Sequence, residues 1–170
     1  MSKRKDIKAY LDFARPYYTA EVPGGFAHAE RLAGRLDEFA RGVTPEPLRP
    51  VLWFLAAFHG LRNRLAGDAS LRAATAEFLR SIDWTDEQIA RGLVALARHA
   101  SEPMTVEEMI VHDADHCEML ARPDAVRDEG GVTFRTPAGR RLAERYRARI
   151  REATWRSETL CPQPTGKDGG

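Results

Sequence analysis

The sequence predicts an all-α, single-domain bundle of about six or seven helices. Apolar residues recur three and four positions apart along most of the chain, as Leu32, Leu36 and Phe39 do. Segments rich in proline and glycine, such as "EVPGG" and "TPEPLRP", separate these stretches. Only "GGVTF" suggests a strand, and the 170 residues show no internal repeat and no linker that would divide them into two domains.

The first half of the chain is expected to form four helices. Pro16 ends the first, and "EVPGG" precedes the second. The third tolerates Pro50 in its first turn and runs through "VLWFLAAFHGLRNRL", which is apolar nearly all round and is therefore expected to be central. The four predicted ranges are about 3–15, 26–41, 50–65 and 69–82.

Three further helices are predicted in the second half, with explicit start signals. Thr85 with Gln88, and Thr105 with Glu108, match the capping-box pattern, and a proline follows Thr136 at the start of the last helix. The predicted ranges are about 85–100, 105–121 and 136–155. The ending "CPQPTGKDGG" is too polar and too rich in proline and glycine to pack, so a domain over 1–155 and a disordered tail over 156–170 are expected.

Composition favours a globular protein with nearly balanced charge. The chain has 26 Lys and Arg against 25 Asp and Glu, which does not predict nucleic-acid binding. The longest apolar run, "VLWFLAAF", is much shorter than the roughly 20 residues of a membrane helix, and no apolar signal segment follows the N-terminus. Cys117 and Cys161 form no disulfide framework. A cytoplasmic protein without a membrane partner is therefore predicted.

Histidine and aspartate residues are the candidates for chemistry. His59 ends the apolar run "FLAAFH", and a buried imidazole needs a hydrogen-bond partner or a metal. Asp113 and Asp115 lie in "VHDADHCEML", where at least one carboxylate is expected to face inward and to be paired or metal-bound. Helical phase alone does not choose between these two aspartates.

Four fragments, in this order and at these spacings, resemble the HD-domain superfamily of metal-dependent phosphohydrolases. They are "ARPYYTAEVPGGFAHAERL", "LAAFHG", "LVALARHA" and "DADHCEML". The later segment "FRTPAGRRLAERYRARI" is similar to the C-terminal helix of the small bacterial branch of this superfamily. The resemblance covers about Ala14 to Ile150 and implies an HD-domain-like helical bundle.

This resemblance also implies a metal site. It maps His28, His59 and Asp115 to metal ligands, and His99 to a histidine that binds a second metal or contacts phosphate in some relatives, as a catalytic group. The usual His-Asp pair is here His59-Gly60. The remaining two histidines and one carboxylate suit a mononuclear site for one divalent transition metal, namely Mn, Fe, Zn or Ni. Replacing Gly60 by aspartate is expected to add a ligand and to tighten metal binding about tenfold.

Arginine residues near this site suggest an anionic substrate. Arg62 and Arg64 follow His59 closely enough to clamp a phosphate, although the pattern is more typical of a solvated pair at a helix C-terminus. The arginine-rich last helix also carries an apolar stripe, so packing is preferred to RNA binding. A core position is preferred for Cys117 over a nucleophile.

Three functions are consistent with these residues. The resemblance favours a phosphohydrolase acting on a small phosphorylated molecule or nucleotide. A degenerate HD domain that binds a ligand or partner without catalysis is the first alternative, because Gly60 cannot bind a metal through a side chain. A mononuclear iron oxygenase is the second, since two histidines and one carboxylate also form iron sites that activate oxygen.

Overall fold

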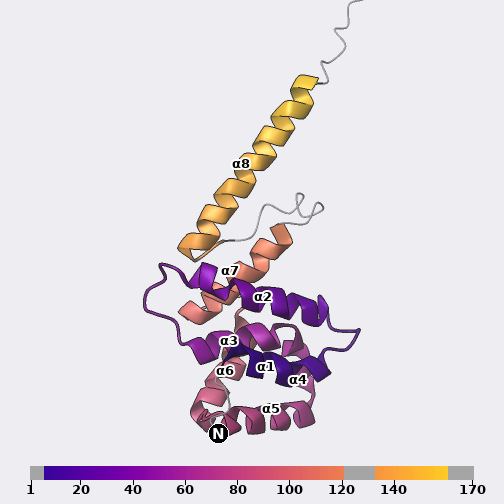
Figure 1. The fold of residues 1–170 in the computed structure, drawn as a ribbon, viewed down its shortest axis with the longest axis vertical. Helices are drawn as coiled ribbons and strands as arrows, with labels where there is room; N and C mark the ends of the chain where they lie inside the picture. Colours follow the sequence, from indigo (N-terminus) through magenta and orange to yellow (C-terminus); the bar gives the residue numbers. More distant parts are fainter. Residues whose placement is uncertain (1–5, 121–132, 161–170) are drawn as a thin grey trace, which may run out of the picture.

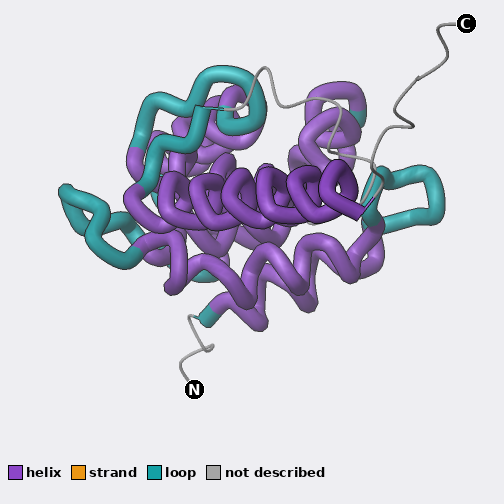
Figure 2. Tube along the Cα trace, turned by 90° about the horizontal axis from the view of Figure 1, so that it is seen from above, coloured by secondary structure: helices purple, strands orange, loops and turns teal. Residues whose placement is uncertain are grey.

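The computed structural model describes residues 6–120 and 133–160, and within these ranges the chain is all-α, as predicted (Figure 2). Short 3-10 turns connect some of the helices, and Thr133 and Phe134, the described residues of "GGVTF", are not in a strand. The helices are α1 (Ile7–Ala14), α2 (Gly25–Ala40), α3 (Arg49–Phe58), α4 (Arg62–Gly67), α5 (Ala69–Ser81), α6 (Asp86–Arg98), α7 (Val106–Leu120) and α8 (Pro137–Leu160), with 3-10 turns η1 (Arg15–Tyr17) and η2 (His59–Leu61).

Helix α3 forms the centre of the bundle, as its apolar composition predicts. Helices α1, α2, α6 and α7 pack around it (Figure 1). Because neighbours cover it on several sides, apolar residues at almost every position are buried rather than exposed. The fully buried residues of α3 are Leu52, Phe54, Leu55, Ala56, Ala57 and Phe58.

The prediction of one continuous helix over 50–65 is wrong, because α3 ends at Phe58 and η2 intervenes before α4. Phe58 has φ −104° and ψ 4°, outside the usual helical values. The Tyr18 hydroxyl donates to the Ala57 carbonyl (3.0 Å) and accepts from the Gly60 amide (3.2 Å). A side chain distant in sequence thus satisfies backbone groups on both sides of the break, which places His59 at the end of α3.

One of the two predicted capping boxes forms completely. Thr85 accepts from the Gln88 amide, and the Gln88 side chain accepts from the Thr85 amide. At the start of α7, the Glu108 amide donates to Thr105 (3.3 Å), but the buried Glu108 carboxylate accepts from the Met104 amide and from Arg98 instead. Tertiary pairing with Arg98 therefore replaces the second half of the local motif.

Helix α8 packs against α2 and α7 near its start, and its later part projects away from the rest of the bundle (Figure 1). It continues to Leu160, beyond the predicted end at 155. Residues 161–170 of the predicted tail lie outside the described residues, so their disorder stays a prediction. No helix in the described part of the chain is both long and apolar enough to cross a bilayer.

Candidate metal site

Three separate elements bring His28, His59 and Asp115 together. His28 lies in the first turn of α2, His59 opens η2, and Asp115 lies on α7. One ligand atom from each residue lies within 4.8 Å of the others. Both imidazole Nε2 atoms face the same carboxylate oxygen, Asp115 Oδ1, at 2.9 Å from His28 and 3.4 Å from His59. The predicted convergence of these three side chains is therefore present.

The turn before α2 determines the position of His28 in the first turn of that helix. Gly24 has φ +77°, in the left-handed region that glycine adopts without steric cost. A Cβ at Gly24 would lie only 3.1 Å from His28 Cβ. The glycine pair in "EVPGG" thus gives both the backbone conformation and the space that this entry to α2 requires.

A second carboxylate orients the ring of His28. Its Nδ1 lies 2.9 Å from Glu118 Oε2, and the same oxygen accepts from Arg31 Nε at 3.3 Å. An ionised carboxylate only accepts hydrogen bonds, so Nδ1 donates to Glu118, and Nε2, at 2.9 Å from Asp115 Oδ1, donates to Asp115 when no metal is bound. Glu118, which sequence analysis does not distinguish from a surface residue, therefore contacts a candidate ligand in the way that outer carboxylates support metal-bound histidines.

The pKa values of His28 and Asp115 are shifted in opposite directions. The hydrogen bond to Asp115 raises the pKa of His28, and Glu118 adds to this effect, while burial opposes it. Burial also acts to raise the pKa of Asp115, but hydrogen bonds to His28 and His59 hold it well below its usual range. Asp115 is therefore ionised at neutral pH and is available as an anionic ligand.

His99 orients His59 through a hydrogen bond, and its predicted catalytic assignment stays a prediction. It is fully buried, and its Nδ1 lies 2.6 Å from the Leu96 carbonyl oxygen, to which it donates. Burial lowers the pKa of His99 to about 4, so the ring is neutral and its Nε2 is an acceptor. His59 Nδ1, at 2.8 Å, donates to this Nε2. His59 Nε2 is consequently the ring nitrogen that faces Asp115 and is left to bind a metal ion.

Replacing His99 by phenylalanine should weaken metal binding without removing a ligand. His59 would lose the acceptor that holds its ring, and losses of such outer partners reduce metal affinity about 10- to 100-fold. His99→Gln offers an acceptor again and should recover part of the affinity. Competition with a chromophoric chelator measures both variants, after circular dichroism has verified the fold. Equal affinity in wild type and folded His99→Phe would contradict this role.

Asp113 has a structural function, because its carboxylate is committed to the start of α8. Its fully buried carboxylate accepts from the Arg135 amide, from the Thr136 amide (2.6 Å) and from the Thr136 hydroxyl (2.8 Å). His112 Nδ1 also contacts it, at 3.0 Å. Asp113 therefore anchors the start of α8 to α7, and the resemblance selected the aspartate that lies beside His28 and His59.

The space beside Gly60 is filled by other side chains. A Cβ there would lie 2.9 Å from Tyr18 Cε1 and 3.0 Å from Val22 Cγ1. An aspartate at this position would have to displace Tyr18, so the expectation that Gly60→Asp simply adds a ligand does not fit this geometry. Burial raises the pKa of Tyr18 to about 12, which keeps its hydroxyl neutral. Sequence reasoning missed Tyr18, because nothing in "RPYYTA" distinguishes it from Tyr17.

Gly60→Ala is expected to destabilise the protein by about 1 to 3 kcal/mol, the usual cost of overpacking. This cost exceeds the gain of up to about 1 kcal/mol from replacing a helical glycine. Gly34→Ala in α2 is the matched control, since a Cβ there would meet nothing within 4 Å and should be neutral or stabilising. Urea unfolding compares the two free energies. A Gly60→Ala variant as stable as Gly34→Ala would show that Tyr18 moves aside at little cost.

The two predicted anion-binding arginines differ in their contacts. The Arg64 guanidinium donates to the Tyr17 carbonyl. Arg62 is half-buried and forms no hydrogen bond or ion pair with any residue in the described ranges. Its charge contributes to lowering the pKa of His99, which places it near the candidate metal site. Arg62 therefore remains available to an external anion, while Arg64 already has a partner within the protein.

Cys117 is a core residue. Its side chain is buried, and burial raises the pKa of its thiol to about 12. Because the thiolate is the reactive form, this cysteine is inert at neutral pH. The preference for a core position over a nucleophile is consistent with both observations.

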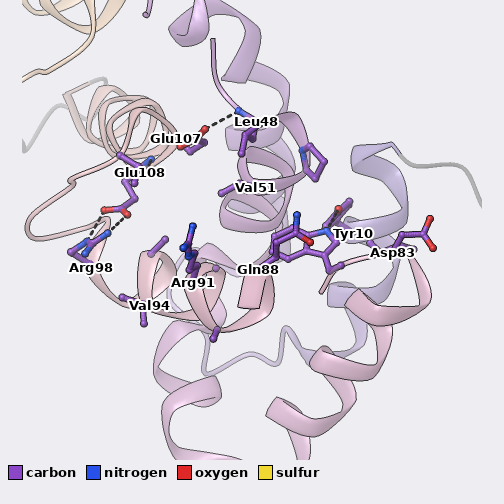
Figure 3. A pocket seen from close by; sticks show the side chains of 17 residues that line it. Tyr10, Leu48, Val51, Asp83, Gln88, Arg91, Val94, Arg98, Glu107 and Glu108 are labelled. Carbon is purple, nitrogen blue, oxygen red and sulfur yellow. Dashed lines mark hydrogen bonds and ion pairs between the residues drawn. The ribbon is translucent and has the colours of Figure 1, made fainter. Parts of the chain in front are cut away.

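A separate pocket of about 780 Å³ lies among residues of α1, α3, α6 and α7 (Figure 3). Its lining includes Val51, Trp84 and Val94 but none of the predicted site residues. The acidic side chains at its edge are already paired: Glu107 accepts from the Leu48 amide (2.7 Å), and Glu108 pairs with Arg98. This pocket therefore presents no free carboxylate from α7 and is not part of the metal site.

Comparisons with protein-family models, with curated proteins and with solved structures give no significant match. Membership of the HD-domain superfamily therefore stays a prediction from the sequence. The chemistry of His28, His59 and Asp115 is the basis for assigning a function.

Proposed function

We propose that this protein is an HD-type, metal-dependent phosphohydrolase that acts on a small phosphate ester or nucleotide through a mononuclear site. One observation carries the proposal. Two imidazoles have their Nδ1 hydrogens committed to Glu118 and His99, and their Nε2 atoms both face Asp115 Oδ1. A metal ion in place of the protons between Nε2 and Asp115 would be held by two imidazoles and one carboxylate, a donor set that suits Mn, Fe, Zn or Ni in the divalent state.

The residues of the site would have two roles, binding the metal ion and orienting its ligands. His28, His59 and Asp115 would hold the metal ion, which when bound supplies Lewis acidity and lowers the pKa of coordinated water. Asp115 contributes the negative charge of the ligand set. Glu118 and His99 accept from Nδ1 of His28 and of His59, which orients both rings with Nε2 toward Asp115. Partial burial of the three ligand side chains, which are 11 to 16% exposed, limits the number of competing waters.

Arg62 supports a phosphorylated substrate. Its half-buried guanidinium lies close enough to His99 to influence that pKa and is unpaired within the described part of the chain. A guanidinium binds phosphate through two parallel hydrogen bonds, so an unpaired one beside a metal site favours an anionic ester. Arg62→Gln should therefore raise KM more than it lowers kcat.

The test combines metal content with turnover. Protein purified without chelator is examined by elemental analysis and is then incubated with nucleotides and phosphomonoesters in the presence of Mn²⁺, Fe²⁺, Zn²⁺ or Ni²⁺. Release of inorganic phosphate that is lost in His59→Ala supports the proposal. Stoichiometric metal binding without any phosphate release would instead favour a non-catalytic binding domain.

A mononuclear iron oxygenase is the second candidate, and the same donor set favours it. Two histidines and one carboxylate with open positions are typical of non-haem Fe(II) oxygenases. Oxygen consumption by anaerobically iron-loaded protein, absent in Asp115→Asn, would support this function. Phosphate release with Mn²⁺ and no oxygen uptake with Fe²⁺ would reject it.

A further inference from the structure

A second pair of imidazoles lies on α7, outside the candidate metal site. His112 and His116 are one helical turn apart, so they share a face of the helix. Their ring centroids are 4.1 Å apart, and the ring planes are inclined by 31°. Neither histidine belongs to the group formed by His28, His59 and Asp115.

Both rings are held in the same tautomer. His112 Nδ1 lies 3.0 Å from Asp113 Oδ1, and His116 Nδ1 lies 2.8 Å from the His112 carbonyl oxygen. Both oxygens accept hydrogen bonds, so each Nδ1 carries the hydrogen and each Nε2 carries a lone pair. Asp113 is itself fixed by the backbone amides of Arg135 and Thr136, which makes the orientation of His112 a consequence of α8 packing.

Neither Nε2 atom is used within the described part of the protein. Within the described ranges, neither atom has a hydrogen-bond partner. Neither atom is fully enclosed, because the enclosed side-chain atom without a partner in these ranges is Thr75 Oγ1. His116 is partly exposed, and His112 as a whole is 7% exposed. Two unpartnered Nε2 atoms one helical turn apart on the same face offer two ligand atoms to one ion, as the i, i+4 histidine pairs of helical zinc sites do.

We propose that His112 and His116 form a second site, for a late first-row divalent ion such as Zn²⁺, Ni²⁺ or Cu²⁺. Imidazole suits these ions, and water completes the shell where the protein offers two ligands. The hydrogen bonds from each Nδ1 to an oxygen acceptor are those that orient metal-binding histidines. This site is independent of the proposed phosphohydrolase function, since it shares no residue with the site at Asp115.

Zn²⁺ titration by calorimetry tests the second site, in a Cys161→Ser background so that this thiol does not contribute. The variants are His59→Ala, which disables the first site, and His116→Gln, which disables the second. His116 is partly exposed, so glutamine should be tolerated, and circular dichroism checks the fold. The expected result is that His59→Ala retains one bound equivalent and that adding His116→Gln weakens this equivalent at least about tenfold.

The outcomes separate the two sites. If His59→Ala binds no Zn²⁺, or if His116→Gln changes nothing in that background, the second site does not exist and the stacked pair is purely structural. If wild type binds one equivalent that survives His59→Ala and is lost in His116→Gln, the second site is supported while the proposed phosphohydrolase site fails. A parallel Cu²⁺ spectrum by electron paramagnetic resonance should show nitrogen coupling that His116→Gln removes.

Discussion

Replacing Asp115 by asparagine should lower the affinity for Zn²⁺ or Mn²⁺ at the proposed phosphohydrolase site about a hundredfold or more, equivalent to about 2.7 kcal/mol. Asp115 is the anionic member of the three candidate ligands, and both imidazole Nε2 atoms face its Oδ1. Asparagine preserves the size and one oxygen of the side chain, so the loss would measure charge rather than packing. Because Asp115 is partly buried, where the effective dielectric constant is lower, its charge attracts a metal ion more strongly than that of a surface carboxylate does.

A surface aspartate on α2 provides the control for this experiment. Asp37 pairs with Arg49 and is 79% exposed, so Asp37→Asn removes the same charge far from the ligands and should leave metal affinity unchanged. Competition with a chromophoric chelator gives both dissociation constants, in a His116→Gln background that excludes the second site. Equal affinities in Asp115→Asn and Asp37→Asn would show that the three side chains converge for hydrogen bonding alone.

Replacing Asp113 by alanine should destabilise the protein by about 3 kcal/mol or more, because each buried polar group left without its partner costs about 1 to 3 kcal/mol. The carboxylate accepts from two backbone amides, at Arg135 and Thr136, and from the Thr136 hydroxyl. Alanine removes all of these acceptors at once and leaves the start of α8 without its anchor. The free energy of urea unfolding measures the effect.

Gly139→Ala tests the same anchor from the side of α8. A Cβ at Gly139 would overlap Asp113 Oδ2 and approach Phe134, so the carboxylate or the helix must shift. The free energy of unfolding of Gly139→Ala should fall well below that of Gly34→Ala, because a Cβ at Gly34 meets nothing within 4 Å. The folded fraction of Gly139→Ala and of Gly34→Ala should keep the wild-type metal affinity at the site of His28, His59 and Asp115. A fall in that affinity with unchanged stability would reverse the assignments of Asp113 and Asp115.

The two aspartates show where prediction from sequence ends. They are two residues apart on α7, and helical spacing places them on different faces without saying which face meets α2 and which meets α8. The resemblance to HD domains selected Asp115. The structure gives the physical reason, since Asp113 is committed to backbone amides more than twenty residues away, at Arg135 and Thr136.

Local sequence determined the fold class, the approximate helix ranges and the capping box at Thr85 and Gln88, because helical periodicity and caps depend on residues within one or two turns. The pairing of His59 with His99, the break held by Tyr18, and the diversion of Glu108 to Arg98 were decided by tertiary structure alone. Each depends on which distant group lies within hydrogen-bond distance after packing. Buried polar groups must find a partner, and only the folded chain specifies which partner that is.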